Sequence, residues 1–229
     1  YPHDYDAIYA EQAKQPSGLT ALDPGGPYNY FNPWWHPFYR RGDLHTMQSV
    51  SKTVTSVVIG VATARHEFPP LDTPVLSFFD ASPVKNVDAR KQRMTLRHLL
   101  TMTAGLEWHE DLPYDDPKNS CGLMEASFDW VRFAVDTPMS DEPGARFNYN
   151  SGATQILAHV FRKATGHDVE EYAARHLFTP LGIERWFWKR TPTGLADTEG
   201  GLYLRPRALA KIAFLFLKDC RWESRAIVE

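Results

Sequence analysis

The sequence lacks the features that mark disulfide-rich and membrane-spanning proteins. It holds two cysteines in 229 residues, Cys121 and Cys220, which lie far apart and match no metal-ligand spacing. Two cysteines cannot build a disulfide scaffold, and we expect both to be free. The longest apolar stretches, residues 54–64 and 208–217, are periodic and too short to cross a bilayer. The sequence therefore predicts no membrane span.

An excess of charge of one sign is also missing. Lysine and arginine number 25 against 28 aspartates and glutamates, which gives a net charge of −3 and a pI near 6.3. The basic residues are scattered along the chain rather than gathered into a run. Nucleic-acid-binding proteins need a concentrated basic surface. We therefore predict no nucleic-acid partner.

Motifs for metal binding and for export are absent too. The nine histidines form no H-x-x-x-H or H-E-x-x-H pattern, and His66-Glu67 is followed by prolines at 69 and 70, which stop a ligating helix. We predict neither a metal nor a cofactor. The first residues show no charged-then-apolar leader. Neither the compartment nor the oligomeric state is predicted by the sequence.

What is present is the composition of a globular protein. Hydrophobic residues make up 43% of the chain and charged residues 23%, enough for a sizeable core in one or two domains. Apolar residues recur at helical spacing in several segments bounded by capping residues and glycines. The predicted helices cover residues 49–65, 95–105 with Gly105 as the terminating glycine, 127–135 capped by Ser127, 152–165 capped by Ser151, 169–178 opened by Asp168 and Glu171, and 206–218.

The stretch Met47-Gln48-Ser49-Val50-Ser51-Lys52-Thr53 is the first candidate for chemistry. It opens an apolar helix, so Ser49 stands at a helix N-terminus and Lys52 lies one turn later on the same face. A hydroxyl placed near unpaired N–H groups, with an amine to take its proton, is an activated nucleophile. A plain N-cap and a surface lysine would have the same spacing, as Ser82-Pro83-Val84-Lys85 illustrates. Ser51 points away from Ser49 around the helix and is expected to be structural.

Tyr149 is the second candidate because it stands in a loop just before a helix and outside its apolar stripe. A phenol there can deliver a proton-transferring oxygen into a cleft, and a neighbouring ammonium such as Lys52 would favour the phenolate. An ordinary buried tyrosine would fit the same pattern. Ser151 offers a further hydroxyl for substrate binding or serves as the N-cap of the next helix.

Aromatic residues are concentrated between Tyr28 and Tyr39, where two prolines forbid a regular helix. Trp34 and Trp35 in this segment, together with Trp108, are candidates for lining an apolar substrate cleft. Packing over the core is an equally good interpretation of the segment. The acidic residues Glu107, Glu110 and Asp111 could face this cleft or be solvated, and we expect them to be solvated.

The order of four segments resembles a known superfamily. Ser49-x-x-Lys52 is followed by residues 95–106 (TLRHLLTMTAGL), then by Pro143-Gly144-x-x-Phe147-x-Tyr149-x-Ser151-Gly152, and then by Gly200-Gly201-Leu202-Tyr203. This series, from about His45 to Leu217, is similar to the serine β-lactamase and penicillin-binding-protein-like superfamily. The likeness is to its class C branch, which includes esterases and 6-aminohexanoate-dimer hydrolases.

The resemblance implies both a fold and a set of roles. The implied fold is α+β, β-lactamase/transpeptidase-like, here mostly the helical part with the nucleophile helix and little of the antiparallel sheet. Ser49 would be the acyl-forming nucleophile, Lys52 its activating partner and Tyr149 the general acid or base. Where many members read Tyr-x-Asn, this chain reads Tyr149-Asn150-Ser151, which is similar to the esterase and 6-aminohexanoate-dimer hydrolase relatives and argues against a dedicated β-lactamase.

A second departure concerns the ends of the chain. The family's third motif, Lys- or His-x-Gly on a strand, should follow the helix that ends near Lys218, and the sequence stops at Glu229. We therefore expect a fragment or a trimmed form that lacks one oxyanion donor and is inactive by itself. The expected organisation is an aromatic-rich lead-in over 1–48, the nucleophile helix over 49–65, a helical subdomain carrying Tyr149 over 66–194, and a glycine turn with a C-terminal helix over 195–229.

The predicted function is a serine hydrolase that cleaves small ester or amide substrates through an acyl-enzyme. Among substrates, carboxylic esters rank first, then short amides of the 6-aminohexanoate type, then β-lactams. Two alternatives remain: a β-lactamase or DD-peptidase, and a non-catalytic ligand-binding or penicillin-sensor module of the same fold. A purely helical interaction domain would explain the helices but not the ordered motifs.

Overall fold

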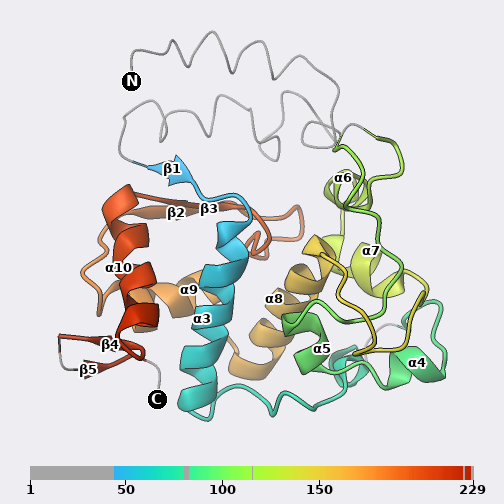
Figure 1. The fold of residues 1–229 in the computed structure, drawn as a ribbon, viewed down its shortest axis with the longest axis horizontal. Coiled ribbons are helices and arrows are strands. Elements are labelled where there is room, and N and C mark those ends of the chain that lie inside the picture. The colour runs from blue at the N-terminus through green and yellow to red at the C-terminus, as the bar shows by residue number, and fades with distance from the viewer. Residues whose placement is uncertain (1–43, 80–82, 115, 224, 228–229) are drawn as a thin grey trace, which may run out of the picture.

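The computed structural model describes residues 44–79, 83–114, 116–223 and 225–227. Within this part of the chain, a short antiparallel sheet lies at the edge of a mostly helical body (Figure 1). No helix among these residues has both the length and the apolar character that crossing a membrane requires. The predicted α+β architecture, mostly helical with a small sheet, is confirmed.

The elements follow one another along the chain as short helices with a few strands between them. They are β1 (His45–Thr46), α3 (Val50–Ala64), η2 (Val75–Phe78), α4 (Ala89–Gln92), α5 (Leu96–Leu100), α6 (Ser120–Glu125), α7 (Trp130–Asp136), α8 (Ser151–Thr165), α9 (Val169–Ala173), η3 (Ala174–Phe178), β2 (Trp186–Trp188), β3 (Leu202–Leu204), α10 (Pro206–Leu217), β4 (Arg221–Trp222) and β5 (Arg225–Ala226).

The sheet joins segments that are far apart in the sequence. Its order is β1-β3-β2, with His45 opposite Leu204 on one side of β3 and Trp186 opposite the same residue on the other. Both pairings are antiparallel. The strand that precedes Ser49 is thereby fixed against the glycine-rich segment near residue 200.

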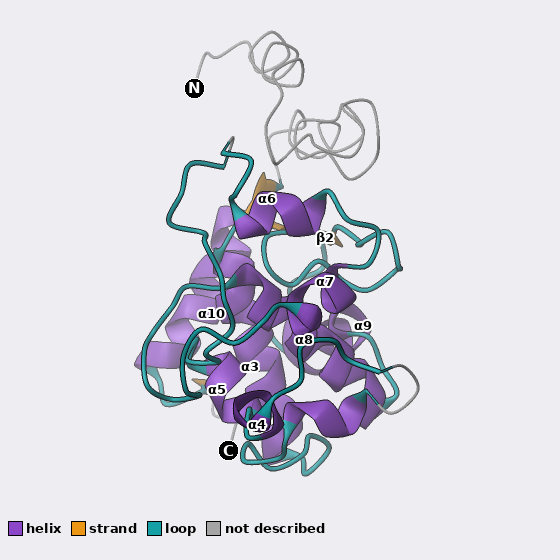
Figure 2. Ribbon diagram, turned by 90° about the vertical axis from the view of Figure 1, so that its right-hand side faces the viewer, coloured by secondary structure: helices purple, strands orange, loops and turns teal. Residues whose placement is uncertain are grey.

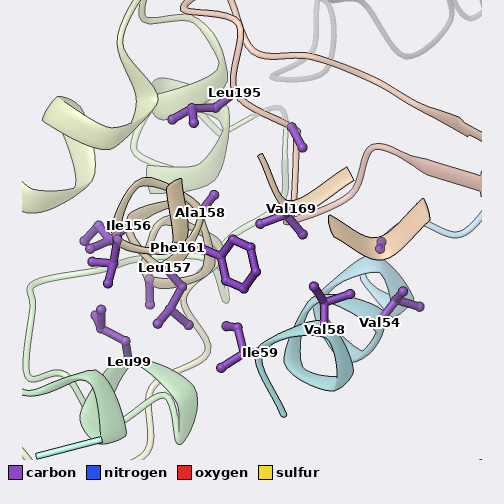
Figure 3. Close-up of a cluster of buried hydrophobic side chains, with 14 of the residues drawn as sticks. Val54, Val58, Ile59, Leu99, Ile156, Leu157, Ala158, Phe161, Val169 and Leu195 are labelled. Atoms are coloured by element: carbon purple, nitrogen blue, oxygen red, sulfur yellow. The ribbon is translucent and has the colours of Figure 1, made fainter. Parts of the chain in front are cut away.

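The helix α8 lies at the centre of the described chain, in contact with α3, α5, α7 and α9 (Figure 2). Its first half is buried on nearly every side, from Ser151 to Ala158. The ring of Phe161 lies between α8 and α3, near Val58 and Ile59 (Figure 3). It packs against Phe68 and edge-on to Tyr172, with ring centroids 5.9 and 5.1 Å apart. This core holds α3 and α8, the two helices that begin beside the candidate residues.

The predicted helices at both of these positions are confirmed, with small corrections at their ends. Ser49 and Arg65 flank α3 as predicted. The prediction that Ser151 caps α8 was wrong, because Asn150 is the N-cap and its side chain accepts from the Ala153 N–H at 2.8 Å. Gly166 ends α8 with φ +73°, as expected of a terminating glycine.

Two other helix boundaries differ from the prediction. Asp129 rather than Ser127 caps α7, and Phe128, which directly precedes this cap, is 72% exposed. The helix α5 ends at Leu100, five residues before Gly105. Gly105 does have a positive φ, but its role is a close approach: a Cβ there would lie 2.5 Å from the Asp141 carbonyl oxygen.

The remaining predictions of helices hold. Asp168 and Glu171 form the expected capping box, and the helix they open runs as α9 and then as the π-helical η3 to Phe178. The helix predicted over 206–218 is α10. Cys121 and Cys220 are both free. The helix α6, which carries Cys121, was not predicted.

Candidate active site

Ser49 stands at the turn between β1 and α3. The turn is fixed by the Met47 N–H, which donates to the Leu202 carbonyl at 2.8 Å, and by Gln48, whose backbone is left-handed with φ +47°. Such a φ is uncommon for a residue other than glycine. The Ser49 side chain is exposed and makes no capping hydrogen bond to α3. Its hydroxyl is therefore not occupied as an ordinary helix cap.

Lys52 brings its amine to that hydroxyl. The side chain is 8% exposed, and Nζ lies 3.2 Å from Ser49 Oγ. Nζ also donates to the Glu199 backbone carbonyl at 2.7 Å and lies 3.4 Å from Glu199 Oε2. Burial opposes the charge on the amine, but the negative Glu199 and the side chain of Tyr149 outweigh it, so the pKa of Lys52 is raised above its usual value.

Tyr149 completes a group of three. The Lys52 Nζ lies 5.1 Å from the centroid of the Tyr149 ring, and the Tyr149 side chain contributes to the raised pKa of Lys52. The loop is positioned by Asn148, whose N–H donates to the Met102 carbonyl at 2.8 Å and whose side-chain amide donates to the Trp108 carbonyl at 3.0 Å. The structure thus brings Ser49, Lys52 and Tyr149 together, although Tyr149 lies 97 positions after Lys52 in the chain.

Ser51 and Ser151 both lie buried behind this group. Ser51 is 0% exposed and its hydroxyl accepts from the Leu202 N–H at 3.1 Å, which confirms the structural role expected of it. Ser151 is also 0% exposed, and its hydroxyl donates to Glu110 Oε1 at 2.6 Å. The predicted substrate-binding hydroxyl of Ser151 therefore faces a carboxylate inside the protein.

Glu110 is buried, so the prediction that it is solvated was wrong. Its carboxylate accepts from the Ser151 N–H and hydroxyl at 2.8 and 2.6 Å, from the Trp108 indole at 2.7 Å and from the Tyr114 hydroxyl at 3.2 Å. Four donors compensate for the lost hydration of the charge. Glu110 joins the 107–114 segment to the start of α8, two residues after Tyr149. The prediction treated Glu107, Glu110 and Asp111 as one acidic run. It is correct for Glu107 and Asp111, which are exposed, but not for Glu110.

Trp108 lies beneath the site rather than at its surface. The indole is 3% exposed, and it packs so closely on the second residue of α8 that a Cβ on Gly152 would lie 2.7 Å from Trp108 Cη2. This packing explains the glycine that follows Ser151. Little of the Trp108 side chain is open to a substrate. The other two predicted cleft residues, Trp34 and Trp35, lie outside the described residues.

Sequence reasoning missed the role of Glu199 and of α6 behind it. Glu199 directly precedes the predicted glycine turn at Gly200-Gly201. This position beside a motif was the signal that could have marked Glu199 as a site residue. Its carboxyl group meets Glu125 and Cys121 of α6: one atom of each side chain lies within 4.8 Å of the others. These three side chains could ligate a cation only if Cys121 lost its proton and Lys52 moved away from Glu199. Burial raises the pKa of the Cys121 thiol, which disfavours that state.

Comparison with known proteins supports the resemblance seen in the sequence. The Beta-lactamase family profile matches residues 32–213. Monacolin J acid methylbutanoyltransferase from Aspergillus terreus is 30% identical over 48% of this chain and 27% of its own length. Esterase EstB from Burkholderia gladioli is 28% identical over 63% of this chain and 38% of its own. The match thus spans well under half the length of these two curated relatives.

A solved structure supports the fold. The D-stereospecific amidohydrolase from a Streptomyces species superposes with a TM-score of 0.61 at 18% identity, over 81% of this chain and 64% of that one. At this identity the similarity shows the fold alone. The family profile covers most of the chain, including Ser49, Lys52 and Tyr149. The chain therefore belongs to the Beta-lactamase family.

Proposed function

We propose that the protein is a serine hydrolase of small esters or amides that works through an acyl-enzyme on Ser49. The observation that supports this most directly is the approach of Lys52 Nζ to Ser49 Oγ at 3.2 Å, in a chain of the Beta-lactamase family. Nucleophile and proton-handling group within hydrogen-bond reach, with a third group orienting the second, are the signature of nucleophilic catalysis. Here Glu199 and Tyr149 orient Lys52.

The proposed reaction has two halves. Ser49 Oγ attacks the substrate carbonyl, its proton passes to the Lys52–Tyr149 pair, and the leaving alcohol or amine takes that proton as the bond to the acyl carbon breaks. Water then attacks the acyl-enzyme and gives a proton to the same pair, which returns it to Ser49 Oγ as the bond to the acyl carbon breaks and the acid leaves. The Ser49 N–H at the start of α3 is the natural donor to the negative oxygen of each tetrahedral intermediate.

We propose carboxylic esters as the first substrate class and short amides as the second, with β-lactams third. The names of the relatives EstB and the Aspergillus methylbutanoyltransferase describe an esterase and an acyl transfer. An acyl-enzyme reacts with an alcohol in the same way as with water, so transfer of the acyl group to an acceptor hydroxyl is a second candidate function. Trp34 and Trp35 remain the proposed cleft residues. For Trp108 we propose a supporting role below Tyr149.

Covalent labelling tests the proposal, because it requires a reactive Ser49 and not a complete turnover cycle. The protein is incubated with a fluorophosphonate, and the labelled residue is identified by mass spectrometry. We expect one adduct, on Ser49, that is absent in Ser49→Ala. The control is Ser56→Ala, an exposed serine on the same helix, which should label normally. Absence of a Ser49 adduct in the folded wild type would contradict the hydrolase and favour a non-catalytic binding module.

Substrate class is tested separately. Hydrolysis of p-nitrophenyl acetate, nitrocefin and a 6-aminohexanoate dimer by the full-length protein is compared, with and without an added alcohol. We expect the ester to react fastest, and Ser49→Ala to abolish the reaction. An ester product that appears only with the alcohol present would show acyl transfer. Preference for nitrocefin would overturn the ranking and point to a β-lactamase.

A further inference from the structure

Behind Lys52 lies a buried group of charged side chains that do not transfer a proton in the proposed reaction. It consists of Glu125 on α6, Asp197 and Glu199 in the turn before β3, and Lys189 after β2, all 7% exposed or less. One carboxylate, Asp197, forms an ion pair with Lys189, with 3.4 Å between Oδ2 and Nζ. A second carboxylate, Glu199, forms an ion pair with Lys52, also at 3.4 Å. Glu125 is a third carboxyl group, which shares the charge of Lys189 with Asp197.

Glu125 and Glu199 form a carboxyl pair. One carboxyl oxygen of Glu125 and one of Glu199 lie within 4.8 Å of each other, and Glu125 Oε2 is buried without a hydrogen-bond partner among the described residues. Two carboxylates at this separation in a buried site repel each other strongly, and a hydrogen bond between them requires a proton. Burial, followed by the charge of Glu199, raises the pKa of Glu125 well above its usual value, while Lys189 opposes the rise.

The proton is expected on Glu125, because Glu199 has a stronger reason to stay charged. Glu199 contacts the Lys52 amine twice, through its carbonyl at 2.7 Å and its carboxylate at 3.4 Å. Ionised Glu199 compensates for the cost of burying the Lys52 ammonium, and protonated Glu125 donates to ionised Glu199. The other groups that face Lys52 are Tyr149 from the loop before α8 and Glu110 from the loop before α6.

We propose that the Glu125–Glu199 pair shares one proton and acts as a positioning element that holds Lys52 as an ammonium directed at Ser49 and Tyr149. Lys52 then donates to Ser49 Oγ and does not remove its proton, which leaves Tyr149 as the proton acceptor. The inference rests on the proposed function for its effect on Ser49, whereas the charge states themselves can be measured on the protein without any reaction.

Two substitutions of similar size separate this proposal from a merely structural role. Glu125→Gln replaces the protonated acid with an amide that can still donate to Glu199, so the ammonium should persist and Ser49 should label within about twofold of the wild-type rate. Glu199→Gln removes the charge that compensates Lys52, so labelling should slow by ~10- to 100-fold. If the two glutamates had only a structural role, the labelling rate of Ser49 should fall in the same way in both variants. Circular dichroism and thermal unfolding verify that both fold.

The pH profile gives the sign of the effect. Without the charge of Glu199, only Tyr149 and Glu110 oppose the effect of burial on the pKa of Lys52, so the amine loses its proton at a lower pH. If the ammonium is the active form, the alkaline limb of the labelling rate moves to lower pH in Glu199→Gln and stays in place in Glu125→Gln. Faster labelling of Glu199→Gln at neutral pH would show that the neutral amine is the active form and would overturn the proposal.

Spectroscopy tests the charge states independently of activity. Infrared spectra at neutral pH should show the carbonyl stretch of a protonated carboxylic acid in the wild type, and Glu125→Gln should lack it. With lysine labelled by ¹³C at Cε, Lys52 should stay protonated over the accessible pH range in the wild type and titrate at lower pH in Glu199→Gln. If Ser49 fails to label but both spectroscopic signatures are present, the proposed hydrolase function is wrong and the proposed protonation of the Glu125–Glu199 pair is supported. If Ser49 labels and either signature is missing, the carboxyl pair is wrong.

Discussion

Lys52 Nζ donates a 2.7 Å hydrogen bond to the backbone carbonyl of Glu199, a residue 147 positions further along the chain. The bond joins the first turn of α3 to the turn that leads into β3. The geometry of that turn depends on Asp197, whose side chain accepts from the Gly200 N–H at 3.1 Å and whose carbonyl accepts from the Gly201 N–H at 3.0 Å. The position of the Lys52 amine is thus set by a backbone turn as much as by side chains.

Gly201→Ala tests this dependence on the turn. A Cβ on Gly201 would lie 2.6 Å from Asp197 Cβ, so the turn must open and the Glu199 carbonyl must move. We expect a loss of about 1–3 kcal/mol in the free energy of unfolding, measured in urea, together with slower labelling of Ser49. The control, Gly194→Ala, has open space around its Cβ but a φ of +82°. It should cost about 1 kcal/mol and leave the labelling rate unchanged, since it lies outside the turn. Equal labelling in both variants would show that the turn does not position Lys52.

Glu110→Gln tests the buried carboxylate below the Tyr149 loop. The carboxylate accepts four hydrogen bonds, and an amide in its place would turn an N–H₂ toward groups that donate. We expect the free energy of unfolding to fall by about 1–3 kcal/mol. Glu107→Gln is the matched control, because Glu107 is three positions earlier and 49% exposed. A change of the same size in both variants would contradict a specific role for Glu110.

Part of the fold and of the site could be predicted from sequence because it depends on local pattern. The apolar spacing after Ser49, the glycine at 166 and the capping box at Asp168 are short-range signals, and each marks an element that the structure contains. The order of motifs located Ser49, Lys52 and Tyr149, which meet in space. Their roles in catalysis remain predictions.

What could not be predicted depends on burial, which one sequence does not record. Glu110, Glu125 and Glu199 have the residue type of solvated surface groups, and each is buried. Distant segments supply donors from Ser151 to Glu110 and the Lys52 cation to Glu199. The helix α6 is six residues long with little apolar periodicity, so its pattern carried no signal. The cap of α8 was assigned to Ser151 rather than Asn150, since both residue types favour that position and only the backbone angles distinguish them.

Lys91 gives a prediction for the dependence of stability on pH. Its side chain is buried, and Nζ donates to the carbonyls of Lys85, Val135 and Thr137. Burial lowers the pKa of Lys91 to about 8, against 10.5 for the ordinary side chain. Between these values the unfolded chain binds more protons than the folded one, so the contribution of Lys91 to stability rises with pH.

Lys91→Met removes that contribution. From pH 8 to 10 the wild type should gain stability relative to the variant by on the order of 1 kcal/mol, because the three carbonyls favour the charged amine and limit the effect. Urea unfolding of both proteins at each pH measures the difference. A wild type that loses stability relative to Lys91→Met over this range would show that the pKa of Lys91 is not lowered.

Tyr149→Phe separates the phenol oxygen from the ring that carries it. The ring packs beside the Lys52 amine, at 5.1 Å from Nζ to centroid, and phenylalanine keeps that contact. Loss of a group that transfers the Ser49 proton should slow labelling by a fluorophosphonate by ~10²- to 10⁴-fold. The free energy of unfolding should change by less than about 1 kcal/mol. Tyr114→Phe is the control, because it also removes a phenol hydroxyl. That hydroxyl donates to Glu110 at 3.2 Å, and the Tyr114 side chain is 41% exposed. If Tyr149→Phe labels at the wild-type rate, proton removal must rest with Lys52, and the ammonium held by Glu199 would have to release its proton before Ser49 could react.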